Sequence, residues 1–205
     1  MIDLREALAE ISSIRGHLAR GIEFRGYGPT TLATTGLLAF VSACIQGYWI
    51  PDPMHSVSGY LVLWTTTAAV SLILIGIETA ARARRVHSGL VAEMLRSAIE
   101  PFLPALVAGV LLTVVLVRCA PRELWMLPSL WQILFSLAVF SSCRFLPKQT
   151  FGVGVWYLAT GITCLVFGQG EGALAPWEMG VPFGVGHLLV AGVLQLGYLQ
   201  DDEQV

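Results

Sequence analysis

Charged residues are scarce in this chain. Asp, Glu, Lys and Arg make up 13% of its 205 residues, whereas a typical soluble domain contains about 25%. Hydrophobic residues make up 55% of the sequence. This balance excludes an ordinary soluble globular domain and indicates an integral membrane protein.

Signatures of catalysis and of nucleotide or metal binding are also missing. The sequence contains no GxSxG, HExxH or P-loop motif, and its four cysteines form no CxxC pair. Its net charge is −2 and it lacks a basic platform with interleaved aromatic residues, so nucleic acid is not an expected partner. We therefore expect a non-enzymatic protein without a cofactor or a bound metal.

A soft-metal site is an alternative that the composition leaves open. Met54, His55, Met126 and Met179 fall toward the same side of the predicted membrane region, and thioether and imidazole groups are ligands that Cu(I) accepts. Only Met54 and His55 are adjacent in the sequence. The spacing therefore does not favour a copper site.

Six long apolar runs, separated by short polar segments, cover most of the chain. A hydrocarbon layer about 30 Å thick needs roughly 20 helical residues at about 1.5 Å each, and the runs approach that length. We predict an all-α, polytopic transmembrane helix bundle in the lipid bilayer, formed by residues 29–199. Its spans are expected at about 31–50, 57–77, 101–117, 127–145, 150–167 and 181–199.

Basic residues define the expected orientation. Ten of the twelve Lys and Arg residues lie before the first span or in the segments after the second and fourth spans, and only Arg118 and Arg122 lie on the opposite side. Basic residues in short loops favour the cytoplasmic side. We therefore predict that both termini are cytoplasmic, including the acidic tail 200–205. Five of the six tryptophans fall toward the outer interface, as in an aromatic belt.

Residues 1–28 are predicted to form a cytoplasmic amphipathic helix. They do not form a cleavable signal peptide in this interpretation, because charges interrupt any apolar core. Apolar residues recur at three- and four-residue spacing from Leu4 to Ile22. Such a helix can lie on the lipid surface, pack against cytoplasmic loops or pair with a second copy of the chain. Ala7 and Gly21 would weaken a coiled coil, so the spacing favours the first two arrangements.

Residues 78–100 are predicted to continue the second span as a helical loop in the cytoplasm. Arg82, Arg84 and Arg85 form a basic cluster there. Cations complement the C-terminal end of a helix and attract anionic headgroups. The simplest role of this cluster is to anchor the topology at the membrane surface, and the alternative is a surface for a cytoplasmic protein partner.

Small residues recur every four positions in three of the predicted spans, and Ala105 with Gly109 forms the pair in the third. The first span carries such a row from Thr31 to Gly47, and Gly180 with Gly184 forms a GxxxG motif near the sixth. Faces of this kind let helix backbones approach closely. We expect them to pack within one chain, and packing between the protomers of a homo-oligomer is the alternative.

The centres of the predicted spans contain no Asp, Glu, Lys or Arg. Cysteines aside, His187 is the ionisable side chain that lies well inside a span. We expect it to share the outer half of the bundle with further polar and sulfur side chains: Gln132, Gln46, Cys44 and Cys164. Such a cavity could bind a polar ligand, and hydrogen bonds between helices would explain the same residues. Both interpretations stay open.

The chain contains the segments FRGYGP at 24–29, RVHSGL at 85–90 and LWMLPSLWQILFS at 124–136. With these segments it resembles a group of uncharacterised bacterial six-span inner-membrane proteins. The resemblance implies a multi-pass protein of the bacterial inner (cytoplasmic) membrane, and it implies no activity and no site residue.

Two functional hypotheses follow from the sequence. The first is a non-enzymatic sensor or anchoring protein that presents its N-terminal helix and its basic loop to a cytoplasmic partner. The second is a small transporter or ligand-binding membrane protein that uses the outer-half cavity around His187. The first hypothesis is favoured because the span centres lack the charged residues that transporters usually carry.

Overall fold

A computed structural model describes residues 28–85, 99–143 and 149–202, and these residues form helices, turns and loops without any strand. Six of the helical segments are long and apolar enough to cross a membrane, which confirms the predicted all-α class. The helices are α2 (Pro29–Trp49), α3 (Val57–Arg85), α5 (Leu103–Cys119), α6 (Leu127–Ser142), α7 (Thr150–Phe167) and α8 (Pro176–Asp202). Short 3-10 turns are η1 (Glu100–Phe102), η2 (Pro121–Met126) and η3 (Gly170–Gly172). The predicted N-terminal helix and most of the 78–100 loop lie outside the described residues.

The start of the last helix differs most from the predicted spans. α8 begins at Pro176 rather than near residue 181. Proline lacks a backbone N–H and suits the first position of a helix, so the helix starts before the apolar run does. Glu178 consequently belongs to the first turn of a membrane-spanning helix. α6 is shorter than expected and ends at Ser142 rather than at residue 145.

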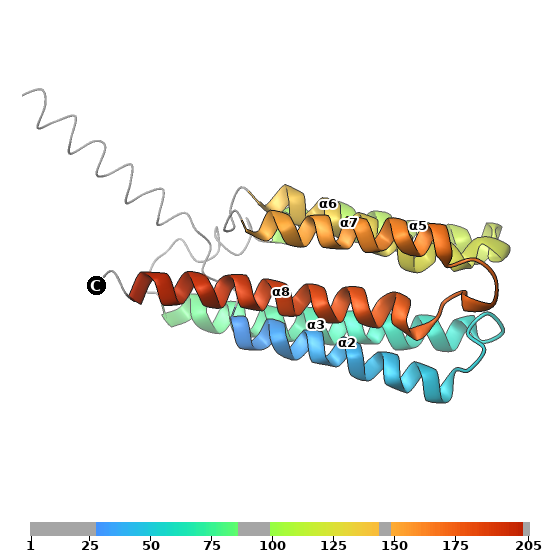
Figure 1. Cartoon of the computed structure of the whole chain (residues 1–205), viewed down its shortest axis with the longest axis horizontal. Helices are drawn as coiled ribbons and strands as arrows, with labels where there is room; N and C mark the ends of the chain where they lie inside the picture. The colour runs from blue at the N-terminus through green and yellow to red at the C-terminus, as the bar shows by residue number, and fades with distance from the viewer. Residues whose placement is uncertain (1–27, 86–98, 144–148, 203–205) are drawn as a thin grey trace, which may run out of the picture.

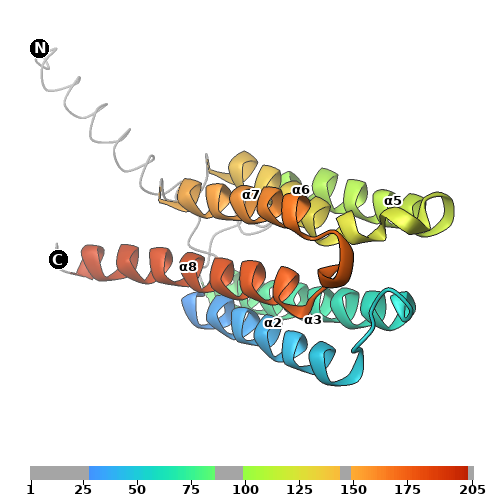
Figure 2. The ribbon, with the colours of Figure 1, turned by 45° about the vertical axis from the view of Figure 1, so that its right-hand side comes forward.

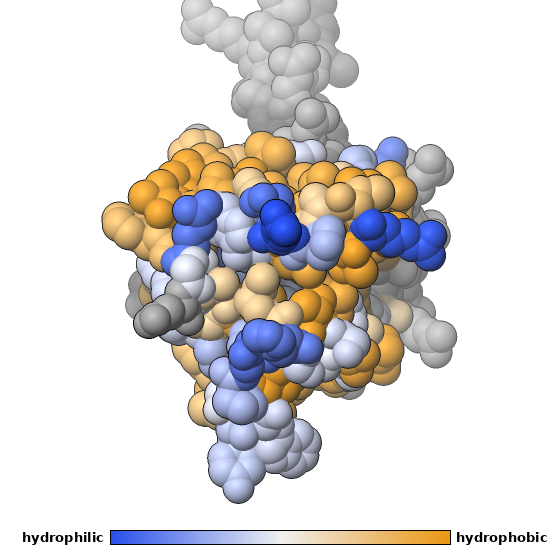
Figure 3. Space-filling view, turned by 90° about the vertical axis from the view of Figure 1, so that its right-hand side faces the viewer, coloured by the Kyte–Doolittle hydropathy of each residue, from blue (hydrophilic) through white to orange (hydrophobic). Residues whose placement is uncertain are grey.

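The helices lie in two layers of three (Figure 1 and Figure 2). One layer contains α2, α3 and α8, the other contains α5, α6 and α7, and α8 packs against α7 and α6 between the layers. The connections 50–56, 120–126 and 168–175 meet at one end of the bundle, at the right of Figure 1, and we call it the three-loop end. Hydrophilic residues gather on this end, and apolar residues surround them (Figure 3).

Glycines bring α2 and α8 into close contact. A Cβ placed on Gly180 would lie 2.5 Å from the Cβ of Ala43, and one placed on Gly184 would meet the ring of Phe40. On the facing helix, a Cβ on Gly36 would lie 2.8 Å from the carbonyl oxygen of Gly184. α2 and α8 form the most extensive helix pair among the described elements. The expected packing of the small-residue faces within one chain is therefore confirmed.

The outer helices present apolar side chains outward. α5 buries none of its residues and contacts α6, where the Trp131 indole N–H donates to the Thr113 hydroxyl across 3.0 Å. Side chains such as Leu106, Val110 and Leu111 are half-exposed or more. An apolar surface of this extent favours aggregation in water, and lipid chains cover it without penalty. The exposed faces therefore agree with a bundle embedded in a bilayer.

We expect the substitution Gly36→Ala to destabilise the bundle. The added methyl group meets a backbone oxygen that cannot move without shifting α8, and overpacking of this kind costs about 1–3 kcal/mol. Thermal unfolding of the purified protein in detergent measures the effect as a lower midpoint.

Gly192→Ala is the matched control, because nothing lies within 4 Å of a Cβ at Gly192. There the better helix propensity of alanine should leave the midpoint unchanged or raise it. Equal midpoints for the Gly36→Ala variant and the wild type would show that the contact between α2 and α8 is not tight.

Candidate functional site

Polar side chains converge in the half of the bundle nearest the three-loop end. Each is at most 3% exposed. We call this set the Glu178 cluster: Gln46 from α2, Tyr60 and Trp64 from α3, Ser129 and Gln132 from α6, Cys164 from α7 and Glu178 from α8. Five of the six described spanning helices therefore contribute to it.

The Gln46 side chain ties three parts of the chain together. Its Oε1 accepts a hydrogen bond from the indole N–H of Trp64 at 2.7 Å, and its Nε2 donates to the carbonyl oxygen of Leu174 at 2.6 Å. Leu174 lies in the connection between α7 and α8, is fully buried and has a positive φ of 58°. Positive φ is unfavourable for a leucine. The hydrogen bond from Gln46 thus helps to hold a strained residue in place.

The Gln132 side chain satisfies a carbonyl group that α8 cannot satisfy itself. Pro182 lies inside α8 and has no N–H to donate to the carbonyl oxygen of Glu178, four residues earlier. The Nε2 of Gln132 donates to this oxygen instead, across 2.7 Å. The Sγ of Cys164 lies 3.7 Å from the same nitrogen. Gln132 therefore has a structural reason to be buried, and its Oε1 has no hydrogen-bond partner within the described residues.

The Glu178 carboxylate is the least satisfied group of the cluster. The side chain is 1% exposed, and its carboxyl group lies near the backbone N–H groups of Leu174 and Ala175 without making a hydrogen bond of good geometry in the described part of the chain. Its Oε1 packs against Gly168, where a Cβ would lie 2.5 Å from it. The Tyr60 hydroxyl is close enough to Glu178 for an electrostatic interaction, and it too lacks a hydrogen-bond partner among the described residues.

The structure brings together Gln46, Gln132 and Cys164, three of the five site residues expected from the sequence. Cys44 does not join them, because it is exposed. It precedes Gln46 by two positions, which is about 200° around a helix of 3.6 residues per turn. One of these two side chains must therefore face outward when the other faces the core.

His187 lies at a different level of the bundle. It follows Glu178 by nine residues, which is about 14 Å along a helix. Its ring lies 6.2 Å from the ring of Phe135 and 6.3 Å from that of Phe183, measured between centroids. Tyr157 stacks on the same two phenylalanines. His187 thus belongs to a separate aromatic group and is not part of the Glu178 cluster.

Sequence reasoning missed Glu178, because the last span was expected to begin after it. A usable signal was present in residues 175–178, Ala-Pro-Trp-Glu. Proline at the first helical position and glutamate in the first turn mark a helix start. Tyr60, Trp64 and Ser129 carried no comparable signal, since aromatic and hydroxyl side chains are common in spans for packing alone.

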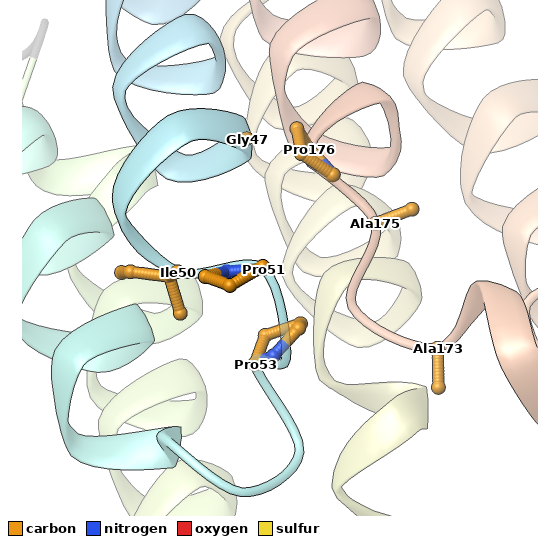
Figure 4. Close-up of a pocket in the computed structure, with 7 residues that line it drawn as sticks. All are labelled: Gly47, Ile50, Pro51, Pro53, Ala173, Ala175 and Pro176. Atoms are coloured by element: carbon orange, nitrogen blue, oxygen red, sulfur yellow. The ribbon is translucent and has the colours of Figure 1, made fainter.

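A small cavity opens at the three-loop end beside the connection that contains Leu174 (Figure 4). Its volume is about 280 Å³, and its walls come from both neighbouring connections: Gly47, Ile50, Pro51, Pro53, Ala173, Ala175 and Pro176. Ala173 and Ala175 flank Leu174 in the sequence. The cavity is large enough for several water molecules, so water can reach the residues on either side of Leu174 in the sequence, while Leu174 itself is buried and its carbonyl group is bonded by Gln46.

An exposed pair lies on the connection 50–56 near this cavity. Asp52 accepts hydrogen bonds from the backbone N–H and the Nδ1 of His55, at 3.1 Å and 2.7 Å. These hydrogen bonds lower the pKa of Asp52 below its usual value. Both side chains are exposed to solvent. The pair closes a tight turn and stands apart from the buried cluster.

No protein-family model, curated protein sequence or solved structure matches this chain. The function must therefore be argued from the geometry of the chain itself.

We expect Gln46→Leu to expose Cys164. The substitution leaves the Leu174 carbonyl and the Trp64 N–H without partners, at a cost of about 1–3 kcal/mol for each group. The connection over the cluster should then open more often, and a thiol reagent should label Cys164 about tenfold faster or more, since about 1.4 kcal/mol corresponds to a factor of ten. Labelling is measured with the other three cysteines replaced by alanine.

Gln169→Leu supplies the matched control, because it is the same exchange at an exposed position of the same connection. It should leave the labelling rate of Cys164 unchanged. If Cys164 is equally protected in all three proteins, Gln46 does not hold this connection closed.

Proposed function

We propose that the protein is a small cation carrier and that Glu178 supplies the charged group of its binding site. This is the transporter hypothesis of the sequence, with its centre moved from His187 to Glu178. A single observation carries the proposal: a fully buried carboxylate, without a side-chain partner or a hydrogen bond of good geometry among the described residues, lies where five of the described long helices meet. Ionisable groups in such positions are expensive and usually serve transport or coupling.

The magnitudes argue against a purely structural role for Glu178. A carboxylate at a helix N-terminus gains about 0.3–1 kcal/mol, and about 2 kcal/mol in favourable buried geometry. Burying an ion costs several kcal/mol even after the protein relaxes. The first turn of α8 and the nearby N–H groups of Leu174 and Ala175 offset part of that cost. Binding of a positive charge would offset it, and this supports a cation as the ligand.

We further propose that the three-loop end faces the outside of a bacterial inner membrane and that both termini are cytoplasmic. The distribution of Lys and Arg and the resemblance to bacterial inner-membrane proteins support this orientation. The cavity beside Leu174 would then open toward the external solution.

A second candidate function is an interaction protein that presents residues 1–28 and the basic cluster of Arg82, Arg84 and Arg85 to a cytoplasmic partner. Two observations favour it. α3 continues as a helix to Arg85, beyond Ala81, where its membrane-spanning part ends. The Glu78 side chain of α3 also packs against Gly28, which links the start of α2 to the helix that carries the basic cluster.

Cysteine labelling tests the proposed orientation. Cys119 ends α5 at the three-loop end and is exposed, so a membrane-impermeant thiol reagent should label it in intact cells. In a variant with Val205→Cys as its single cysteine, labelling should require permeabilised membranes. If Cys119 were labelled only after permeabilisation and the cysteine at position 205 were labelled in intact cells, the three-loop end would lie in the cytoplasm.

Flux measurements in proteoliposomes test the carrier. We expect an imposed gradient of H⁺, Na⁺ or K⁺ to drive cation flux through the wild-type protein, followed with dyes for internal pH and membrane potential. Glu178→Gln removes the charged group and should reduce the flux roughly tenfold or more, the equivalent of at least about 1.4 kcal/mol.

Two further proteins complete this experiment. Glu123→Gln is the matched control, because Glu123 is an exposed carboxylate at the same end of the bundle, and it should keep the flux. A chain without residues 1–24 should also keep it if the bundle alone is the carrier. Absence of flux with every gradient, or equal flux in the Glu178→Gln variant, contradicts the carrier and leaves the interaction protein as the better explanation.

A further inference from the structure

We infer that the cation bound at this site is a proton, held on the carboxyl group of Glu178, and that the described structure is the closed, protonated state. The inference rests on the proposed carrier function and names its ligand. Three features of the Glu178 cluster support it. These are the lack of space for a metal ion around the carboxyl group, the numbers of hydrogen-bond donors and acceptors, and the charges near the carboxyl group.

Space around the carboxyl group favours a proton over a metal cation. Both Glu178 oxygens, the Oε1 of Gln132 and the Tyr60 hydroxyl are shielded from contact with a water-sized sphere. A sodium or potassium ion needs several oxygen ligands arranged around a cavity of its own size. A proton forms a covalent O–H bond and needs no cavity, so the closed cluster can hold it without rearrangement.

The count of donors and acceptors also favours the acid form. An ionised Glu178 offers two acceptor oxygens, and the Oε1 of Gln132 in the same cluster is itself only an acceptor. Within the described residues none of these three oxygens receives a hydrogen bond of good geometry, although the backbone N–H groups of Leu174 and Ala175 lie near Glu178. A proton on Glu178 converts one acceptor into a donor. The acid form therefore adds a hydrogen-bond donor where donors are few, whereas the carboxylate would add only an acceptor.

The surrounding charges do not compensate a carboxylate. The Glu178 Oε1 and the carbonyl oxygen of Cys164 each lie 2.5 Å from the position that a Cβ on Gly168 would take, so the carboxyl group adjoins the C-terminal, negative end of α7. The titratable groups that face it are Tyr60 on α3 and Cys164 on α7. Helices α2, α6 and α7 contain no Lys or Arg. Among the described residues, the backbone N–H groups of Leu174 and Ala175 and the first turn of α8 are then what favours a negative charge.

The cavity of Figure 4 provides the route for exchange with water. Ala173 and Ala175 line it, and Leu174, which lies between them in the sequence, is buried and bonded by Gln46. When the 168–175 connection moves away, the O–H bond of Glu178 breaks and the proton passes to a water molecule as hydronium. Water and the N-terminus of α8 then stabilise the carboxylate. Reprotonation from water reverses the step, and the connection closes over the neutral acid.

Infrared spectroscopy of the reconstituted protein tests the inference directly. Exposed carboxyl groups are ionised at neutral pH, so a C=O stretching band of a protonated carboxyl group must come from a shielded acid. We expect this band in the wild type, in Glu123→Gln and, with a shift, in Glu178→Asp. We expect its loss in Glu178→Gln. Transfer to D₂O should shift the band slowly in the wild type and faster in Gln46→Leu, which loosens the connection.

The possible results test the bound proton and the carrier function separately. Absence of the band in the wild type, or its persistence in a folded Glu178→Gln variant, overturns the inference that Glu178 carries the proton. If the band is absent while a sodium or potassium gradient drives flux that depends on Glu178, the carrier stands and its ligand is a metal cation. A band that depends on Glu178, together with flux driven by a proton gradient alone, supports the proton.

Discussion

The hydrogen bonds of two buried amides hold the first turn of α8 in place, and much of the candidate site depends on them. Gln46 bonds the carbonyl group of Leu174 just before this turn, and Gln132 bonds the carbonyl group of Glu178 within it. The second bond exists because Pro182 removes the N–H that would otherwise serve that carbonyl. With its backbone bonded from α2 and from α6, the turn keeps the Glu178 side chain inside the bundle.

The glycine contacts between α2 and α8 make this arrangement possible. Gly36, Gly180 and Gly184 allow the two helix axes to approach until backbone atoms nearly touch. Gln46 follows on the same helix face, within reach of the connection before α8. A wider separation would move its amide away from Leu174 and would leave room for water around the carboxyl group. Close packing therefore contributes directly to the chemistry of the site, since exclusion of water raises the cost of a buried charge.

The candidate site was only partly predictable. Gln46 and Gln132 could be selected because uncharged polar residues in apolar runs stand out, and helix packing brings them near Cys164. Cys44 was misplaced because the sequence does not say which face of α2 turns inward. Glu178 was missed because hydropathy locates the centre of a span and not its first turn. Its burial depends on contacts with residues more than a hundred positions away in sequence, such as Tyr60.

Composition and the lengths of the apolar runs by themselves determined that the described part of this chain forms six helices long and apolar enough to cross a membrane, because a bilayer requires about 20 apolar residues for each span. The repeated small residues also determined that helices approach closely. Only the tertiary structure decided which helices pair and where α8 begins in space. It also decided that a glutamate just after a glycine-rich connection lies in the core, because this depends on two distant side chains: Gln46 bonds the backbone of Leu174, and Gln132 bonds the backbone of Glu178.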